Sequence, residues 1–304
     1  MTRRVFSSKQ FNLKSLRDET GAPLIKCKEA LDKFSDYDQA IQYLKEKNMI
    51  LAKKKQANEA KVSILCLAST PNSLLSLRVN SETDFVARNN DFLNFVKSSI
   101  AKVVDHQHLF TAGLNSVTRD ILDGVRCPVS SLRDDQDQIT ARTQEKIEIA
   151  EVFKDELAEG EVLGSYVHKQ LKENIGPSFA YVVFRAEGNA SDKTLREVGD
   201  QLSAHIFCEM PEFVSMDQIP GEVVQEKRSE FEAEIRSQHA RKPKEIQEKI
   251  LSGKLSKEFD ELVLLNQRAN FWNQDKTVSD YLKEIEKTRN IKIHVCRFKI
   301  FKSS

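Results

Sequence analysis

Apolar residues recur at helical spacing in the first sixty residues, in groups separated by turn-forming residues. The groups run from Leu13 to Leu16, from Leu24 to Phe34 and from Ala40 to Leu44, with breaks at Gly21-Ala22-Pro23 and Ser35-Asp36. This pattern predicts a small bundle of three helices over residues 12–60. Its last part, from Lys47 onward, is predicted to be a basic helical linker.

Two short apolar runs then flank the turn signal Ser69-Thr70-Pro71-Asn72-Ser73, which predicts a β-hairpin over residues 62–80. A polar junction follows. After it comes a run spaced like a helix that buries one face: Phe92, Leu93, Phe95, Val96, Ile100 and Val103. We assign residues 61–143 to a first α+β subdomain.

A later stretch repeats the order of strands, polar junction and helix. The predicted strands are Ile147–Val152, Val162–Val167 and Phe179–Ala186; the junction is Gly188 to Asp192, and the helical stripe is Leu195, Val198, Leu202, His205 and Ile206. The repetition favours an α+β fold with duplicated core subdomains, the second of which begins with residues 144–221.

Residues 222–262 carry a sparse apolar seam among charged residues, interrupted by Arg241-Lys242-Pro243-Lys244, and we assign residues 222–268 to one segment. Because Pro suits the first position of a helix, we expect two antiparallel helices here. They form either a protruding hairpin or an ordinary pair of surface helices. Asn290–Ile300 then predicts a strand that returns to the second subdomain, so residues 269–304 close that subdomain and the hairpin is an insertion.

The junction Ser81-Glu82-Thr83-Asp84-Phe85-Val86-Ala87-Arg88-Asn89 combines helix-capping residues with an aromatic one. Phe85 is open to two interpretations. It turns inward and packs, since burying a Phe is worth roughly 1.5–3 kcal/mol, or it stands beside a carboxylate at a rigid helix start and meets a partner. The second predicted junction has Ser191-Asp192-Lys193 and no aromatic, so the scaffold does not require a ring there.

Composition changes this picture little. The 304 residues are 31% charged with a net charge of +1, which argues against a nucleic-acid-binding or membrane-surface protein. We expect no direct nucleic-acid binding, although Lys53-Lys54-Lys55 could touch an acidic partner or rRNA. Since no run of about 18 apolar residues is present, we expect no membrane insertion. The five cysteines lie far apart, which fits a reducing compartment better than a zinc site or a disulfide framework.

The sequence lacks the usual signatures of an active site. It has neither G-x-x-x-x-G-K-[ST] nor G-x-G-x-x-G, so we expect no phosphate-binding loop. Its histidines lack the spacing of a metal site, and His106 and His108 beside Asp105 form only a weak pattern. Glu82 and Asp84 are better explained as capping residues than as a catalytic pair. We therefore expect no enzyme in the bond-making sense, no cofactor and no metal site.

Several short motifs along the chain are those of one known family. In order they are Leu16-Arg17-Asp18-Glu19-Thr20-Gly21-Ala22, Cys27-Lys28-Glu29-Ala30-Leu31, Thr83-Asp84-Phe85-Val86-Ala87, Gly160 to His168, Pro211-Glu212-Phe213 and Lys242-Pro243-Lys244-Glu245-Ile246. They resemble translation elongation factor Ts, the guanine nucleotide exchange factor for elongation factor Tu. The resemblance implies a UBA-like N-terminal bundle and a helical hairpin like the family's coiled-coil module.

The resemblance also implies which residues bind elongation factor Tu in its GDP-bound and nucleotide-free states. Thr83, Asp84, Phe85 and Val86 would dislocate the partner's Mg²⁺, with Phe85 as the wedge, Asp84 as the polar anchor, Thr83 as the cap and Val86 as an apolar contact.

Four further residues are implied as docking residues. Arg17, Gly21 and Leu24 would face the partner's nucleotide domain, although Pro23-Leu24 departs from the family's Gly-Met. His168 would face its third domain, or be a strand-end histidine with a satisfied hydrogen bond.

Residues 1–11 lack acidic residues and are rich in Arg and Ser, as transit peptides are. Arg4-Val5-Phe6-Ser7 resembles a mitochondrial processing site. We therefore expect a transit-peptide remnant and a place in the mitochondrial matrix, with a bacterial or cytosolic start as the alternative. A different class of function also stays open: a scaffold subunit of a larger mitochondrial assembly, with exchange activity reduced or lost.

Overall fold

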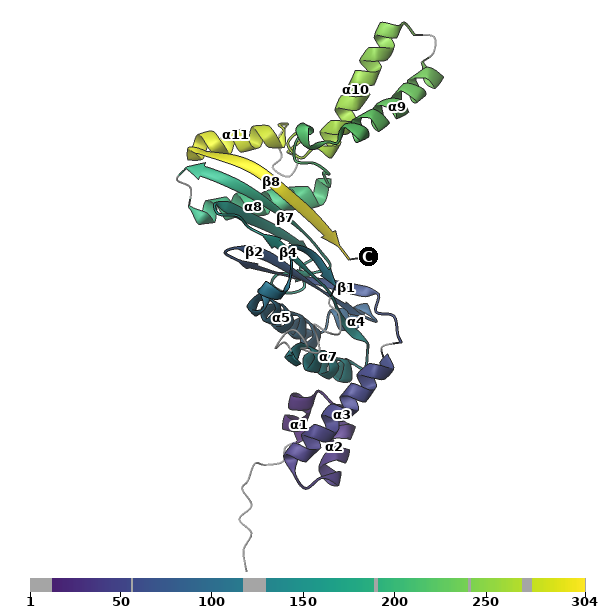
Figure 1. Ribbon diagram of the computed structural model, residues 1–304, viewed down its shortest axis with the longest axis vertical. Helices are drawn as coiled ribbons and strands as arrows, with labels where there is room; N and C mark the ends of the chain where they lie inside the picture. The colour runs from purple at the N-terminus through teal and green to yellow at the C-terminus, as the bar shows by residue number, and fades with distance from the viewer. Residues whose placement is uncertain are drawn as a thin grey trace, which may run out of the picture. The chain divides into compact units, whose positions relative to one another are not determined.

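The chain divides into two compact units. The computed structural model describes residues 13–55, 57–116, 130–188, 191–239, 242–269 and 275–303. The first unit comprises Met1–Glu156, Lys169–Ser178 and Ser303–Ser304, and the second comprises Leu157–His168 and Phe179–Lys302. Each unit combines helices with a sheet (Figure 1), so the predicted mixture of helix and strand is confirmed. The expected transit-peptide remnant, residues 1–11, lies outside the described residues.

Three helices at the start of the first unit form a small core of their own. They are α1 (Leu13–Thr20), α2 (Leu24–Lys33) and α3 (Tyr37–Lys55). The predicted apolar positions meet inside, where Leu16, Cys27 and Leu44 are at most 1% exposed. Asn48 of α3 donates a 2.7 Å hydrogen bond to the carbonyl oxygen of Thr20 at the end of α1, which ties the two helices together.

The first unit contains a sheet of five strands in the order β3-β4-β2-β1-β6. The strands are β1 (Val62–Thr70), β2 (Ser73–Ser81), β3 (Gly113–Ser116), β4 (Ile147–Glu156) and β6 (Ile175–Gly176). The predicted hairpin is confirmed, because β1 and β2 pair antiparallel and the turn at Pro71 and Asn72 brings Thr70 opposite Ser73.

Helices cover the first sheet on one side (Figure 1). They are α5 (Asn90–Asp105) and α7 (Ser130–Thr143), and a short 3-10 helix, Gln107–Leu109, follows α5. All six apolar residues predicted for the α5 face are buried. The sequence pattern missed α7, whose mostly polar surface shows no continuous apolar stripe. α7 packs on both α5 and α3. Its Asp137 is 9% exposed, and burial raises the pKa of that carboxyl to about 6.

β4 corrects one predicted boundary. The sequence pattern assigns Ile147–Val152 to a second subdomain that begins at residue 144, but β4 pairs with β2 along its length and belongs to the first unit. Ile147, Ile149 and Val152 are buried in the first unit's core. Alternation along a strand shows which side is apolar, not which strand lies next to it, so the sequence could not place β4.

The second unit has a three-stranded sheet in the order β5-β7-β8. Its strands are β5 (Glu161–His168), β7 (Ser178–Gly188) and β8 (Ile291–Lys302), and its core helices are α8 (Asp192–Glu209) and α11 (Val278–Arg289). The core joins Phe184 of β7, Leu202 of α8 and Leu282 of α11. Helix α8 and β5 approach closely at two glycines: a Cβ on Gly199 would lie 2.8 Å from the Cα of Gly164.

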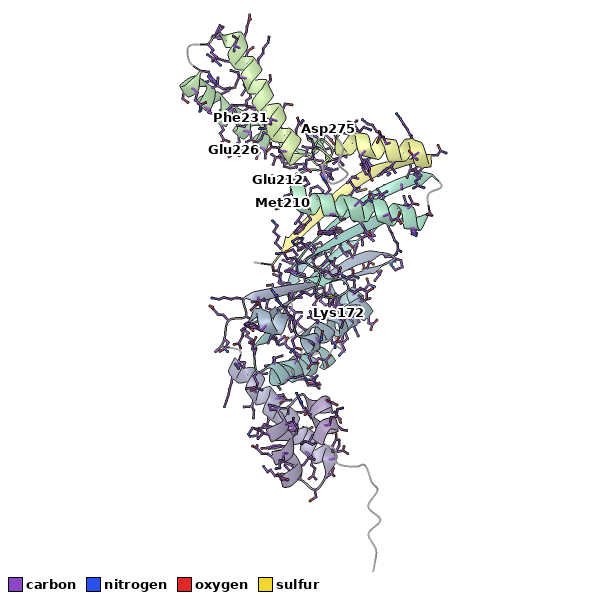
Figure 2. The ribbon with its side chains drawn as sticks, turned by 180° about the vertical axis from the view of Figure 1, so that it is seen from behind. Lys172, Met210, Glu212, Glu226, Phe231 and Asp275 are labelled. Atoms are coloured by element: carbon purple, nitrogen blue, oxygen red, sulfur yellow. The ribbon has the colours of Figure 1, made fainter. Side chains whose placement is uncertain are left out.

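Two charged helices, α9 (Gly221–Gln238) and α10 (Lys244–Leu262), come between β7 and β8 in the sequence, after the 3-10 helix Met216–Gln218. Their side chains, Glu226 and Phe231 of α9 among them, project from both helices (Figure 2). The ion pair Lys227–Glu258 at 2.9 Å joins the first half of α9 to the end of α10, and the pair Glu234–Lys254 at 2.5 Å lies further along α9 but further back along α10, so the helices are antiparallel.

The base of this hairpin is packed more deeply than its sparse apolar seam predicts. Phe259 of α10 is 5% exposed and forms a buried cluster with Ile219 and Val263, to which Val223 and Leu255 add partly buried side chains. The outer part of the hairpin lies beyond this cluster.

Candidate functional site

The candidate site is centred on α4 (Asp84–Ala87), one helical turn between β2 and α5. Its Phe85 side chain is 83% exposed. Ala87 is buried, and Val86 packs partly against the core of the first unit. Of the two interpretations of Phe85, the one in which the ring turns inward is therefore wrong.

Thr83 caps this turn and is itself held in place. Its backbone is extended, and its hydroxyl oxygen accepts a hydrogen bond from the Val86 N–H at 3.5 Å, as predicted for a cap. The carboxylate of Glu145 accepts two hydrogen bonds from Thr83, from the backbone N–H at 3.0 Å and from the hydroxyl at 2.7 Å. The start of α4 is thus fixed to the segment that leads into β4.

Glu82 ties the same junction to two further segments. Its carboxylate accepts hydrogen bonds from the backbone N–H of Lys146 at 2.5 Å and from the Asn58 amide at 2.9 Å, and the Nζ of Lys55 lies 3.6 Å away. Partial burial acts to raise the pKa of Glu82, but these hydrogen bonds and the lysine charge outweigh it, and the pKa is lowered. These contacts give Glu82 a structural role at the junction.

Asp84 is the polar residue that stands beside the ring. Its carboxylate lies 4.0 Å from the guanidinium of Arg88, and the two side chains are 60% and 72% exposed. An ion pair so exposed contributes little to stability. Both side chains are therefore available to a partner.

The three candidate residues of the bundle fall into two kinds. Arg17 is exposed and Leu24 is 47% exposed, beside Ile25 at 73%. Gly21 is buried with a φ of +69°, and a Cβ there would lie 2.7 Å from the backbone carbonyl oxygen of Gln138 on α7. The prediction that Gly21 contacts a partner is therefore corrected: this glycine allows α7 to approach the turn between α1 and α2.

His168 lies at the end of β5 in the second unit. Its ring stacks on Phe207 with a centroid distance of 4.6 Å and an interplanar angle of 24°. The hydroxyl of Tyr166 lies 3.3 Å from its Nδ1, within hydrogen-bonding distance. This geometry matches a strand-end histidine with a satisfied hydrogen bond, and the docking role stays a prediction.

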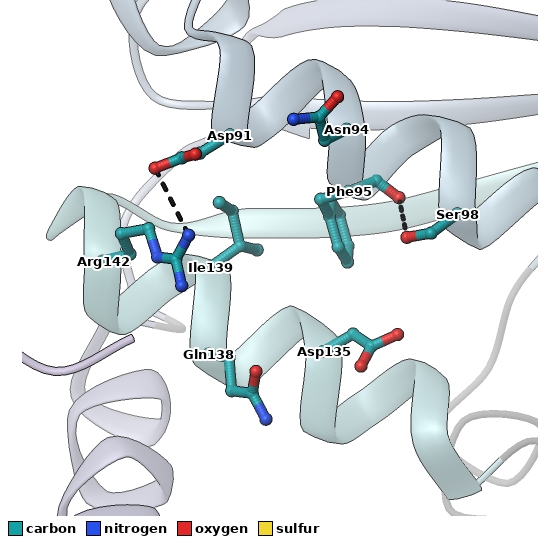
Figure 3. Close-up of a pocket in the computed structure, with 8 residues that line it drawn as sticks. All are labelled: Asp91, Asn94, Phe95, Ser98, Asp135, Gln138, Ile139 and Arg142. Carbon is teal, nitrogen blue, oxygen red and sulfur yellow. Dashed lines mark hydrogen bonds and ion pairs between the residues drawn. The ribbon is translucent and has the colours of Figure 1, made fainter. Parts of the chain in front are cut away.

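A hollow of about 430 Å³ lies between α5 and α7 in the first unit (Figure 3). Phe95 and Ile139 form its apolar floor, and each is at most 7% exposed. Its charged groups are paired within the protein: Asp91 with Arg142 at 3.4 Å, and Asp135 with Lys102. The hollow is therefore a gap between packed helices whose charges already have partners.

A metal site and a membrane-spanning helix are both absent from the described ranges. There, no three residues among His, Cys, Asp and Glu are grouped in a way that could hold a metal ion. In the same ranges, every helix is too short or too polar to cross a membrane.

Sequence reasoning missed Glu145 and Asn58, which hold the junction from distant parts of the chain. One signal for Glu145 exists once the strand pairing is known. Because Ser81 lies opposite Ile147, residue 145 must come beside Thr83. Asn58 has no comparable signal, since it lies outside the strands.

Comparison with known proteins gives a single family. The family model of Elongation factor TS matches residues 82–303. The chain is 32% identical to Elongation factor Ts of Sinorhizobium fredii over 288 residues, which are 93% of this chain and 88% of the relative. It is 30% identical to "Elongation factor Ts, mitochondrial 2" of Paramecium tetraurelia over 307 residues, 98% of each chain. It is 27% identical to Elongation factor Ts of Orientia tsutsugamushi over 292 residues, 96% of this chain and 90% of the relative. The chain therefore belongs to the elongation factor Ts family.

Proposed function

We propose that the chain is a guanine nucleotide exchange factor for elongation factor Tu and promotes GDP release by disturbing the partner's Mg²⁺ site. One observation carries the proposal. Phe85, in a chain of the elongation factor Ts family, is a large apolar side chain left 83% exposed on a firmly held helical turn.

The contacts around Phe85 support the proposal that its ring is already in position for insertion into a partner. Thr83 and Glu82 fix the start of the turn through Glu145 and Lys146, and the buried Ala87 fixes its end. Because the ring is exposed in the free protein, its burial in a complex would contribute roughly 1.5–3 kcal/mol to binding. A group that is already positioned also loses little conformational freedom when it binds.

The mechanism needs no bond chemistry, so we propose that the protein is not an enzyme in that sense. An exchange factor binds the nucleotide-free, Mg²⁺-free state of its GTPase more tightly than the GDP-bound state, and linkage weakens the nucleotide by the same factor. Mg²⁺ needs near-octahedral ligands at about 2.0–2.1 Å, so a small shift of its supports is enough to release it. Phe85 is the wedge, the exposed Asp84 the polar anchor, Thr83 the cap and Val86 an apolar contact.

Other surfaces would extend the complex. The exposed Arg17 and Leu24 support docking of the N-terminal bundle on the nucleotide domain, with Gly21 shaping the turn behind them. We place His168 and its aromatic neighbours against the third domain of the partner. We also propose that the N-terminal bundle is UBA-like, that the core subdomains are duplicated, and that α9 and α10 form an inserted coiled-coil module.

We place this activity in the mitochondrial matrix. The similarity to the mitochondrial protein of Paramecium tetraurelia and the acid-free residues 1–11 support this location. An import assay with isolated mitochondria, using the chain with and without residues 1–11, tests the location.

The release of a fluorescent GDP analogue from elongation factor Tu, with and without this protein, tests the function. We expect release to accelerate with protein concentration. In the presence of GDP, raising free Mg²⁺ should loosen the complex and chelation should tighten it, because the protein and Mg²⁺ oppose each other on the partner. The scaffold function would be favoured by a complex whose affinity depends on neither Mg²⁺ nor GDP, and which elutes from a sizing column only within a large assembly.

A further inference from the structure

A small pocket opens beside α4, within the first unit, and most of the residues that line it lie outside the junction from Ser81 to Asn89. Its volume is about 230 Å³. An engineered apolar cavity of about 150 Å³ holds a benzene molecule, so this pocket has room for one large apolar side chain. Its walls are mostly apolar: Val62 and Ile64 of β1, Ala87 of α4, and Leu171 and Pro177 of the segment around β6. Leu171 is 38% exposed, so part of the apolar wall faces solvent.

The pocket and the exposed ring lie on different faces of the same helical turn. Asp84, Ala87 and Arg88 line the pocket and are spaced as residues that share one helix face. Phe85 does not line it. At 3.6 residues per turn, Phe85 points about 100° away from Asp84 around the helix axis. A partner that covers α4 would therefore meet an apolar projection and an apolar recess side by side.

The rim of the pocket is predominantly cationic. Lys61, Arg88 and Lys169 line it together with one carboxylate, that of Asp84. Lys61 pairs with Glu59 at 2.6 Å, but these side chains are 76% and 75% exposed. The Arg88–Asp84 contact is equally open to water. Exposed pairs of this kind contribute little to stability, so they are easily exchanged for partner carboxylates.

We infer that this pocket receives one large apolar side chain from an acidic segment of the GTPase, next to the place where Phe85 enters the GTPase. The inference rests on the proposed function, because it names a second contact of the same complex. The apolar wall and the volume select the side chain, and the three cations select carboxylates around it. Phe85 thus disturbs the nucleotide site. The pocket fixes the position of the partner beside α4, and its cations speed association with an acidic segment.

A photoreactive benzophenone amino acid in place of Leu171 tests the occupant directly. Leu171 is partly exposed, so the replacement leaves the core intact. On irradiation of the complex with nucleotide-free elongation factor Tu, we expect a cross-link to a peptide that has a large apolar residue flanked by Asp or Glu. A cross-link to a basic or wholly polar peptide would overturn the inference. So would the absence of any cross-link while GDP release remains normal.

Charge reversal tests the rim. We expect Lys61→Glu combined with Lys169→Glu to slow association with elongation factor Tu by about 5–10-fold at low salt, with the difference shrinking at high ionic strength. The matched control is a pair of exposed lysines on α11 of the second unit, Lys283→Glu with Lys287→Glu, which should associate normally.

The outcomes separate the two proposals. Loss of exchange in Phe85→Ala together with normal association of the rim variant overturns the pocket and leaves the exchange function standing. If the rim variant and the control variant slow association equally, the effect comes from net charge alone, and the pocket is again overturned. An unmodified chain that neither binds elongation factor Tu nor accelerates release overturns both.

Discussion

Replacing both exposed residues of α4, Asp84→Ala with Phe85→Ala, should abolish stimulated GDP release and leave the fold intact. The stability change follows from the exposure of the two side chains. Because Phe85 is 83% exposed, less than a fifth of its side chain is removed from water. Taking the same fraction of the roughly 1.5–3 kcal/mol for a fully buried Phe gives about 0.5 kcal/mol or less. The exposed Asp84–Arg88 contact adds at most about 1 kcal/mol.

A nearby phenylalanine provides the matched control. Phe92, on the first turns of α5, is 0% exposed and belongs to the core of the first unit. Phe92→Ala should lower the free energy of unfolding by about 3–5 kcal/mol, through lost burial and the cavity left behind. The same change from Phe to Ala therefore separates a ring that stabilises the fold from a ring that is held outside it.

Two measurements on the same preparations decide the question. Urea unfolding gives the free energy of unfolding, and the release of a fluorescent GDP analogue from elongation factor Tu gives the exchange rate. We expect the α4 variant to unfold within about 1–1.5 kcal/mol of the unmodified chain and to release GDP at the unstimulated rate. A loss of stability comparable to that of Phe92→Ala would refute the reasoning from exposure. Normal exchange by a stable α4 variant would refute the role of the ring.

Further predictions concern the supports of the site and the second unit. Glu145→Gln weakens the two hydrogen bonds from the start of α4; we expect a loss of about 1–2 kcal/mol in urea unfolding and slower GDP release, and unchanged release would contradict it. Gly199→Ala places a Cβ 2.8 Å from Gly164, and differential scanning calorimetry should show a lower melting temperature from about 1–3 kcal/mol of overpacking. Burial raises the folded-state pKa of Asp137 to about 6, above the 3.8 of the unfolded chain, so this carboxyl lowers stability as pH rises from about 4 to above 6. Asp137→Asn should remove this contribution, and a stability profile from about pH 4 to 7 that matches the unmodified chain would contradict it. Deleting residues 232–254 with a short linker spares the buried cluster at the hairpin base and should give a soluble protein with unchanged thermal unfolding of the core, whereas aggregation with several linkers would count against it.

Local patterns predicted those parts of the fold whose cause is local. The turn at Pro71-Asn72 and its flanking apolar runs are enough to define the β1–β2 hairpin, because both strands are set by the same short segment. The α5 stripe from Phe92 to Val103 needs only a helical period. The cap at Thr83 likewise depends on neighbours within one turn.

The remaining features depend on residues far apart in the chain. Whether Phe85 packs or stands out is decided by how Glu145 and Lys146 hold the junction, and no spacing rule connects them to α4. The buried position of Gly21 depends on α7, a helix with too little apolar pattern to be recognised. The resemblance to a family could name candidate residues, but only the packing separates the exposed Leu24 from the buried Gly21.

The pairing of β6 with β1 has a consequence for how the protein is made. Ile175 of β6 is fully buried in the first unit and pairs with Cys66 of β1, yet it follows β5, which belongs to the second unit. A nascent chain released only as far as Glu156 therefore still lacks one edge of its first sheet. Synthesis of the two units is interleaved, so the first cannot finish folding before part of the second has left the ribosome. For the same reason, no single cut in the chain yields a complete first unit that could be exchanged between proteins as one segment.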